Sequence, residues 1–258
     1  MKLRDHDYHL EVEGQGPPLL LLHGFTGSSR TWTMLSARLQ ETYTVYRIDL
    51  LGHGKTPPAA YQRMRLTEQV KDLQALLATR TEPWTVLGYS MGGRIALMLA
   101  ACSTQVQQTI AVSTTPGLKT AHERRSRRVQ DRLLQQMLLE DGLEAFVRHW
   151  EALPLFASQR QLPSFAQQQI RSERLSQSAE GLAASLAAQG TGNMPSLWKS
   201  IHDLPIEWIV GEYDEKFKQI AQQAADSKKI HQISHATHAP HIDQPEKFVT
   251  IVEKLLLT

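Results

Sequence analysis

Hydrophobic and polar positions alternate in residues 9–13, whereas residues 19–22 are four consecutive leucines. Alternation with a period of two is typical of a half-exposed strand, and a short continuous apolar run is typical of a strand buried on both faces of a parallel sheet. Further apolar runs of strand length occupy residues 44–49, 84–87, 109–113, 206–210 and 229–233. These runs predict the strands of one central sheet.

Segments with helical periodicity separate these strands. Residues 67–78 place four apolar side chains on one helical face, with Thr67 as the expected N-cap. Further helices are expected in residues 31–39, 94–100, 217–225 and 246–257. Because strands and helices alternate, the fold class is predicted to be α/β, with a mostly parallel central sheet and helices on both faces.

The alternation is interrupted after Pro116-Gly117, and no strand candidate appears between Leu118 and Leu204. Helical periodicity covers residues 121–140, 142–150, 164–175 and 179–189 instead. A parallel sheet needs another strand to continue, so we interpret residues 118–199 as an inserted helical cap. The sheet domain would then consist of residues 1–117 and 200–258.

Composition and charge narrow the classes of partner. A formal net charge of +2 over 258 residues, without a basic run interleaved with aromatic residues, argues against nucleic acid. The first eight residues contain no apolar signal region, and no apolar run approaches the ~20 residues of a membrane span, so we expect a cytoplasmic protein. The single cysteine, Cys102, is expected to pack in the core. No Cys/His cluster has zinc spacing, and we expect neither a metal nor a cofactor.

A serine occupies the junction between the strand at residues 84–87 and the helix that follows, within Gly88-Tyr89-Ser90-Met91-Gly92. This G-x-S-x-G pattern is that of a nucleophile elbow, in which only glycine fits beside the sharply turned serine. The turn exposes the Ser90 hydroxyl at a helix N-terminus, where backbone N–H groups stabilise negative charge. The pattern also arises by chance, so its meaning depends on the rest of the chain.

A serine hydroxyl is weakly reactive at neutral pH and needs an imidazole that a carboxylate orients. In this fold the acid follows the serine, and the histidine follows the acid. Asp214 lies directly beyond the strand at residues 206–210, and His238 lies in the loop after the last strand. We therefore predict that Ser90, Asp214 and His238 form a catalytic triad.

Residue type alone leaves other members of the triad open. Glu212 is an alternative acid, and His235 or His241 is an alternative base. The predicted oxyanion-hole donors are the backbone N–H groups of Phe25 and Met91, which follow the second strand and the serine.

The chain resembles the α/β-hydrolase family along its whole length. The residues that carry this resemblance are His23-Gly24-Phe25, Asp49, Gly52-His53-Gly54, Gly88 to Gly93, Gly211 to Asp214, His238, Pro240-His241 and Pro245. Two positions depart from the usual family pattern: Leu51 replaces a proline, and His235 replaces a common glycine. Neither change affects a reacting group.

A narrower resemblance involves the cap. The matching residues are Pro116-Gly117-Leu118, Glu123-Arg124, Asp131-Arg132, Phe146, Trp150, Leu153 to Gln159, Ile170-Arg171-Ser172, Gly211 to Phe217 and Gly88 to Arg94. They are similar to the 2-succinyl-6-hydroxy-2,4-cyclohexadiene-1-carboxylate synthases of menaquinone biosynthesis. That family releases pyruvate from 2-succinyl-5-enolpyruvyl-6-hydroxy-3-cyclohexene-1-carboxylate, so the resemblance implies a carbon–oxygen lyase in which the serine acts as a base.

Such a substrate is a small anion with three carboxylates, which arginine binds in a planar, bidentate manner. The cap begins with six cations against two acids, and Arg125 and Arg132 are expected to be solvated. Arg94, in an otherwise apolar helix, is expected to need an anionic partner. The resemblance implies substrate contacts by Tyr89, Arg94, Arg124, Trp150 and Arg171, with Arg127 as a further candidate.

Two other classes of function fit parts of the pattern. A serine hydrolase would use the same triad to cleave an ester, thioester or carbon–carbon bond through an acyl-enzyme. A binding protein of the same fold would not need all three triad residues, so the complete set argues against it. Trp150 could also belong only to the core of the cap.

Overall fold

A sheet of seven strands lies at the centre of the computed structural model, which describes residues 1–257. Their spatial order is β3 (Leu10–Gly14), β5 (Thr44–Ile48), β4 (Pro18–Leu22), β6 (Trp84–Tyr89), β7 (Val106–Val112), β8 (Ile206–Gly211) and β9 (Ile230–Ile233). Strand β3 pairs antiparallel with β5, and the other neighbours are parallel. The predicted mostly parallel sheet is therefore confirmed. A separate hairpin joins β1 (Lys2–Leu3) to β2 (His6–Asp7).

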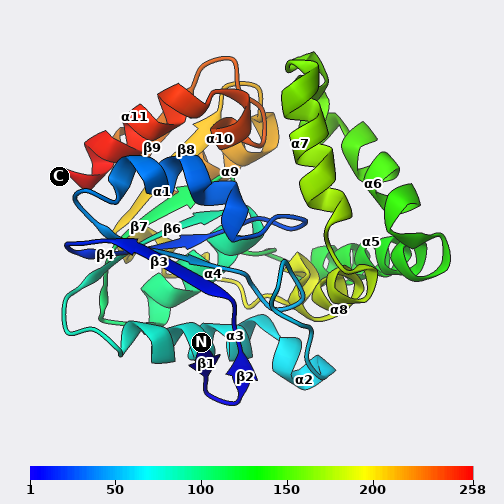
Figure 1. Cartoon of the computed structure of the whole chain (residues 1–258), viewed down its shortest axis with the longest axis horizontal. Helices are drawn as coiled ribbons and strands as arrows, with labels where there is room; N and C mark the ends of the chain where they lie inside the picture. Colours follow the sequence, from blue (N-terminus) through cyan, green and yellow to red (C-terminus); the bar gives the residue numbers. More distant parts are fainter. Residues whose placement is uncertain (258) are drawn as a thin grey trace.

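Strand β4 shows why the leucine run forms a central strand. Leu20 and Leu22 pack into a core with α3 (Leu66–Leu77) and α4 (Met91–Cys102) on one face of the sheet. Leu19 and Leu21 pack on the other face with α1 (Thr33–Leu39) and α11 (Pro245–Leu256). Figure 1 shows these helix pairs on opposite sides of the strands. Because helices cover both faces of the sheet, β4 has no solvent-facing side and can be apolar at every position.

The remaining helices are short or belong to the segment between β7 and β8. They are α2 (Tyr61–Met64), α9 (Glu215–Ala224), α10 (Pro240–Asp243) and the 3₁₀ helices at Ser29–Trp32, Pro154–Gln161, Thr191–Asn193, Ile201–Asp203 and Ser227–Lys229. The α-helices between β7 and β8 are α5 (Ala121–Glu140), α6 (Gly142–Ala152), α7 (Ser164–Leu175) and α8 (Ala179–Gln189). We call these four the cap helices. No strand lies between β7 and β8 in residues 1–257, as predicted.

The two local predictions for Thr67 and Cys102 are wrong. Helix α3 begins at Leu66, and the extended Arg65 is its N-cap without a side-chain bond. Leu66 is buried, so packing rather than capping fixes the first turn. Cys102 is exposed because α4 reaches the surface at its last residue. Within the described residues, no helix has both the length and the apolar composition needed to cross a membrane.

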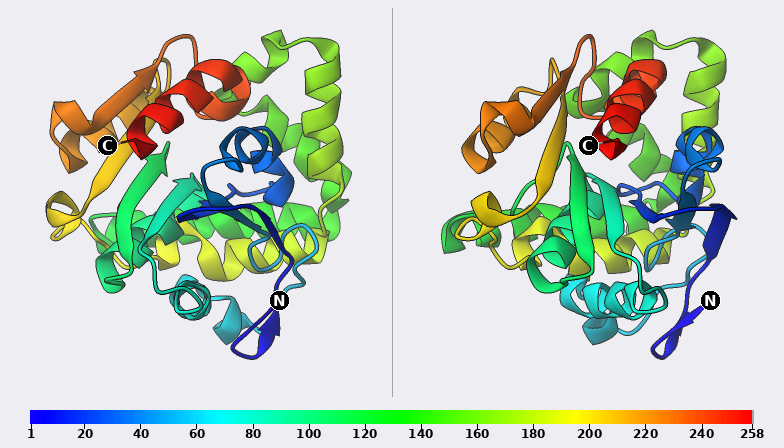
Figure 2. Two further views of the ribbon diagram at one scale, coloured as in Figure 1. Left: turned by 60° about the vertical axis from the view of Figure 1, so that its left-hand side comes forward. Right: turned by 90° about the vertical axis from the view of Figure 1, so that its left-hand side faces the viewer.

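The cap helices lie to one side of the sheet, in green and yellow in Figures 1 and 2. Backbone contact joins them to the core where α8 meets the loop after β5. A Cβ atom on Gly181 would lie 2.4 Å from the carbonyl oxygen of Gly52, and one on Gly52 would lie 2.5 Å from that of Gly181. Only glycine at both positions allows this approach.

A carboxyl group makes a second connection between the cap helices and the core. The Ser28 hydroxyl, in the loop after β4, donates to Glu173 Oε1 of α7 at 2.8 Å, and Thr31 Oγ1 donates to the same atom at 3.4 Å. Burial raises the pKa of Glu173 above 4.5, although both hydrogen bonds oppose this shift. The folded protein therefore holds this proton more tightly than the unfolded chain does.

The raised pKa of Glu173 predicts that the effect of Glu173→Gln on the free energy of unfolding depends on pH. Wild-type stability falls as pH rises from 4.5 through the raised pKa, because the folded state must then bury a charge. The amide carries no charge, so the free energy of unfolding of Glu173→Gln relative to wild type should rise between pH 4.5 and neutrality. Urea unfolding at both pH values measures it.

The matched control is Glu180→Gln in α8. Glu180 is exposed, and hydrogen bonds from its own backbone and Ser178 lower its pKa, so the relative stability of this variant should not rise over the same range. A constant difference between Glu173→Gln and wild type would contradict the burial of this carboxyl group.

Candidate active site

Backbone packing at the end of β6 fixes Ser90 in the left-handed region, with φ 50° and ψ −102°. A Cβ atom on Gly88 would lie 2.4 Å from the carbonyl oxygen of Gly92, and one on Gly92 would lie 2.4 Å from that of Leu22. Backbone atoms cannot move aside as a flexible side chain can, so glycine is required at both positions. The Ser90 N–H donates to the carbonyl of Val112 at 2.8 Å, which holds the turn against β7.

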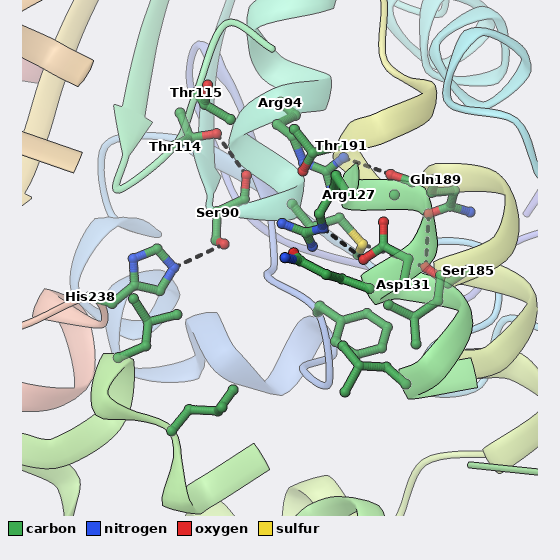
Figure 3. Close-up of a pocket in the computed structure, with 18 of the residues that line it drawn as sticks. Ser90, Arg94, Thr114, Thr115, Arg127, Asp131, Ser185, Gln189, Thr191 and His238 are labelled. Atoms are coloured by element: carbon green, nitrogen blue, oxygen red, sulfur yellow. Dashed lines mark hydrogen bonds and ion pairs between the residues drawn. The ribbon is translucent and has the colours of Figure 1, made fainter. Parts of the chain in front are cut away.

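The three predicted triad residues lie within hydrogen-bonding distance of one another. His238 Nε2 is 3.1 Å from Ser90 Oγ, and His238 Nδ1 is 2.9 Å from Asp214 Oδ2. His238 is 3% exposed and Asp214 is 5% exposed. With Nδ1–H donating to the carboxylate, Nε2 is left free to accept the serine proton. Figure 3 shows the Ser90 side chain pointing toward the ring of His238.

The alternative acid and bases do not contact Ser90. Glu212 accepts a hydrogen bond from the backbone N–H of His235 at 2.8 Å, and His235 is exposed. The ring of His241 contacts the ring of Tyr89, and the two ring centroids are 4.3 Å apart. Burial lowers the pKa of His241 to about 3, and neither of its ring nitrogens has a partner within residues 1–257. The geometry therefore favours Asp214 and His238.

The two predicted oxyanion-hole residues line the cavity that contains Ser90. Met91 is the first residue of α4, where backbone N–H groups lack helical acceptors. Phe25 lies in the loop after β4, and Gly92 N–H ties this loop to α4 by donating to the carbonyl of His23 at 3.1 Å. In the described part of the chain, the N–H groups of Phe25 and Met91 have no protein acceptor.

The cavity above Ser90 has a volume of about 270 Å³ and is lined by both core and cap residues. Its charged lining residues are Arg94, Arg127, Asp131 and Lys216. Arg127 Nε donates to Asp131 Oδ1 at 2.7 Å, so this cation is paired within the protein. Figure 3 shows Arg94, Arg127 and Asp131 grouped on the side of Ser90 away from His238. No group of His, Cys, Asp and Glu side chains in residues 1–257 could hold a metal ion.

Arg94 is 8% exposed, and its acceptor differs from the one expected. Its guanidinium donates to the backbone carbonyl of Gln189, at the end of α8, at 2.6 Å. Within the protein this acceptor is a carbonyl dipole of the cap helices, so the expected anionic partner would have to be a ligand. Burial and, to a smaller extent, the nearby Arg127 together lower the pKa of Arg94 to about 9, whereas Asp131 opposes the shift. At neutral pH Arg94 remains charged without a carboxylate partner among the described residues.

The predicted aromatic contacts also reach the cavity. Tyr89 is 8% exposed and lines it beside the ring of His238, with the ring centroids 5.4 Å apart. Trp150 lines it as well, while stacking on Phe146 at 5.5 Å and contacting Phe25 at 5.3 Å. Trp150 therefore belongs both to the core of the cap helices and to the cavity wall.

Two predicted arginines lie away from this cavity. Arg124 donates to the carbonyl of Leu118 at 3.1 Å, because it occupies the first turns of α5. Arg171 pairs with Glu151 and lines a neighbouring cavity, with Phe156 in the wall of both. Their contact with a substrate stays a prediction.

Sequence reasoning missed Lys216 as a cavity residue. Its position was a usable signal, because Lys216 follows the predicted triad acid by two residues and Asp214 is the N-cap of α9. It also missed Thr114, Ser185, Gln189 and Thr191, polar lining residues without a recognisable motif. The positions of Ser185, Gln189 and Thr191 depend on how the cap helices pack, which no local pattern specifies, whereas Thr114 follows the end of β7.

Comparison with known proteins places the chain in a family. Residues 19–251 match the model of the alpha/beta hydrolase family. A Bacillus subtilis protein, provisionally named 2-succinyl-6-hydroxy-2,4-cyclohexadiene-1-carboxylate synthase, is 42% identical over 95% of this chain and 93% of its own length. A Salmonella paratyphi C protein named as the same synthase is 30% identical over 97% of this chain and 98% of its own. The structure of MenH from S. aureus superposes with a TM-score of 0.90 and 35% identity, covering 97% of each chain.

These matches extend over nearly the whole chain, cap helices included. The superposition on MenH covers 97% of this chain, so it includes most of the segment between β7 and β8. The chain belongs to the alpha/beta hydrolase family and is an enzyme of this fold, similar to the 2-succinyl-6-hydroxy-2,4-cyclohexadiene-1-carboxylate synthases.

Proposed function

We propose that this enzyme is a lyase of menaquinone biosynthesis. It would eliminate pyruvate from 2-succinyl-5-enolpyruvyl-6-hydroxy-3-cyclohexene-1-carboxylate to give 2-succinyl-6-hydroxy-2,4-cyclohexadiene-1-carboxylate, the product named by its relatives. The observation that carries the proposal is Arg94, a buried cation without a carboxylate partner in residues 1–257, in the cavity of Ser90. Burying an unpaired charge is costly, and an anionic substrate would offset this cost.

The reaction begins with proton transfer. His238, oriented by Asp214, takes the proton of Ser90. The resulting alkoxide removes the acidic proton from the ring carbon that carries the succinyl ketone. The electron pair moves through the ring alkene and breaks the bond between the ring carbon and the enolpyruvyl oxygen. The departing enolpyruvate becomes pyruvate by tautomerisation. No electron acceptor is needed, so the proposed step requires no redox cofactor.

The backbone N–H groups of Phe25 and Met91 would stabilise the negative charge that develops on the ketone oxygen. Tyr89, Arg94, Arg127 and Trp150 already line the cavity and would contact the substrate. Arg124 and Arg171 would join them only if the cap helices or these side chains moved, because both are engaged elsewhere. Such a biosynthetic step on a small anion fits an enzyme of the cytoplasm.

Removing the Ser90 hydroxyl tests its role as the base. Released pyruvate, measured by coupling to lactate dehydrogenase, should appear with the wild type and fall by about 10³-fold or more in Ser90→Ala, because the base is lost. An unchanged melting temperature would serve as the folding control. Full activity of Ser90→Ala would contradict the mechanism, and rapid turnover of simple esters without pyruvate release would favour a serine hydrolase.

Removing the charge of Arg94 tests its role in binding the substrate. Arg94→Gln should lower kcat/KM for pyruvate release by about tenfold to hundredfold, the effect of losing a charge-assisted hydrogen bond. Arg94→Lys should recover part of this loss, because it keeps the charge but not the planar geometry. The rate is measured at several substrate concentrations to separate KM from kcat.

Arg125→Gln is the matched control for Arg94→Gln. Arg125 is exposed on α5 and does not line the cavity, so the same loss of one charge should leave kcat/KM within about twofold. An equal loss in both variants would indicate an effect of overall charge and would sink the assignment of Arg94.

A further inference from the structure

Lys216 stands at the mouth of the cavity that contains Ser90. The residue as a whole is exposed, yet it lines the cavity together with Ser90 and Arg94. It lies in the first turn of α9, directly after the segment that contains Asp214. Asp214, two residues earlier, hydrogen-bonds to His238, so the backbone at the start of α9 lies beside the predicted triad.

The charges around the cavity leave Lys216 without a neutralising partner. Of the three cations that line it, only Arg127 pairs with a carboxylate, that of Asp131. On α9 the neighbouring Glu215 pairs with Lys218 at 2.9 Å, and no carboxylate within residues 1–257 lies at ion-pair distance from Lys216. The cavity therefore presents two unneutralised cations, one deep and one at its mouth.

The environment of Lys216 disfavours its charge in the absence of an anion. Burial lowers the pKa of its ammonium group, and the nearby Arg127 lowers it further, whereas Asp214 opposes this shift. A contact with the ring of Phe217, at 5.3 Å from Nζ, gives the cation limited compensation. An anionic ligand at the mouth would relieve the repulsion between Lys216 and Arg127.

We propose that Lys216 is a specificity-determining residue that binds one carboxylate of a dicarboxylate ligand, while Arg94 binds the other. The inference rests on the proposed function, because a substrate with several carboxylates supplies both groups. A flexible ammonium at the exposed mouth suits the capture of an incoming anion, and the more rigid, buried guanidinium suits its orientation. Monocarboxylates would satisfy only one of the two cations.

The test uses the intact enzyme and isothermal titration with succinate, which needs no turnover. Lys216→Gln should weaken succinate binding by about tenfold or more, and Lys216→Arg should restore most of the affinity, because the lost contact is a charge-assisted hydrogen bond. The affinity for butyrate, which has one carboxylate, should fall much less in Lys216→Gln than the affinity for succinate. Unfolding curves of each variant serve as the folding control.

Lys218→Gln is the matched control on the same helix. Lys218 pairs with Glu215 and donates to the carbonyl of Glu212, and it does not line the cavity, so its loss should leave succinate affinity within about twofold. The proposal is overturned if Lys216→Gln binds succinate as tightly as the wild type, if both variants lose affinity equally, or if the wild type does not bind succinate.

The two proposals fail in different ways. Succinate binding that depends on Lys216, in an enzyme that releases no pyruvate, would support the site and reject the proposed reaction. Pyruvate release with unchanged KM and unchanged succinate affinity in Lys216→Gln would support the reaction and reject the role of Lys216.

Discussion

The close approach of three backbone segments around Ser90 is the constraint on which the site depends. Gly88 and Gly92 allow the end of β6, the start of α4 and the end of β4 to meet within distances that no side chain permits. This contact holds the serine in a left-handed conformation and directs its hydroxyl toward His238. It also places Met91 at the start of a helix beside the loop of Phe25, so the positions of the proposed base and of the proposed oxyanion donors have one structural cause.

The second determinant is the cover that the cap helices place over the buried cation Arg94. Gln189 covers Arg94 from α8, and Trp150 from α6 contacts Phe25 of the core. Removing water strengthens the interaction of the buried guanidinium with any anion that enters, because the effective dielectric constant falls. The proposed triad would provide an activated serine that several reactions could use. The cations around it would restrict which ligands can bring a reacting carbon to it.

Local motifs and chain order were sufficient to predict the sheet, the elbow and the geometry of the three predicted triad residues. Glycines flanking a serine demand one backbone arrangement, and the carboxyl ends of parallel strands meet at one edge, so Asp214 and His238 could be expected there. The partner of Arg94 could not be predicted, because a carbonyl at the end of α8 has no sequence signature. The positions of Arg124, Arg171 and Lys216 depend on the rotation and packing of separate helices, which short-range patterns leave open.

The central claim is that Ser90 acts as a base and forms no covalent intermediate. The most direct measurement is a rapid-quench single turnover followed by intact-protein mass spectrometry. The substrate is deuterated at the ring carbon that carries the succinyl ketone. The account predicts slower pyruvate release from the deuterated substrate and no added mass on the enzyme at any time. An adduct on Ser90 that forms and decays at the rate of turnover, with no isotope effect on pyruvate release, would contradict it.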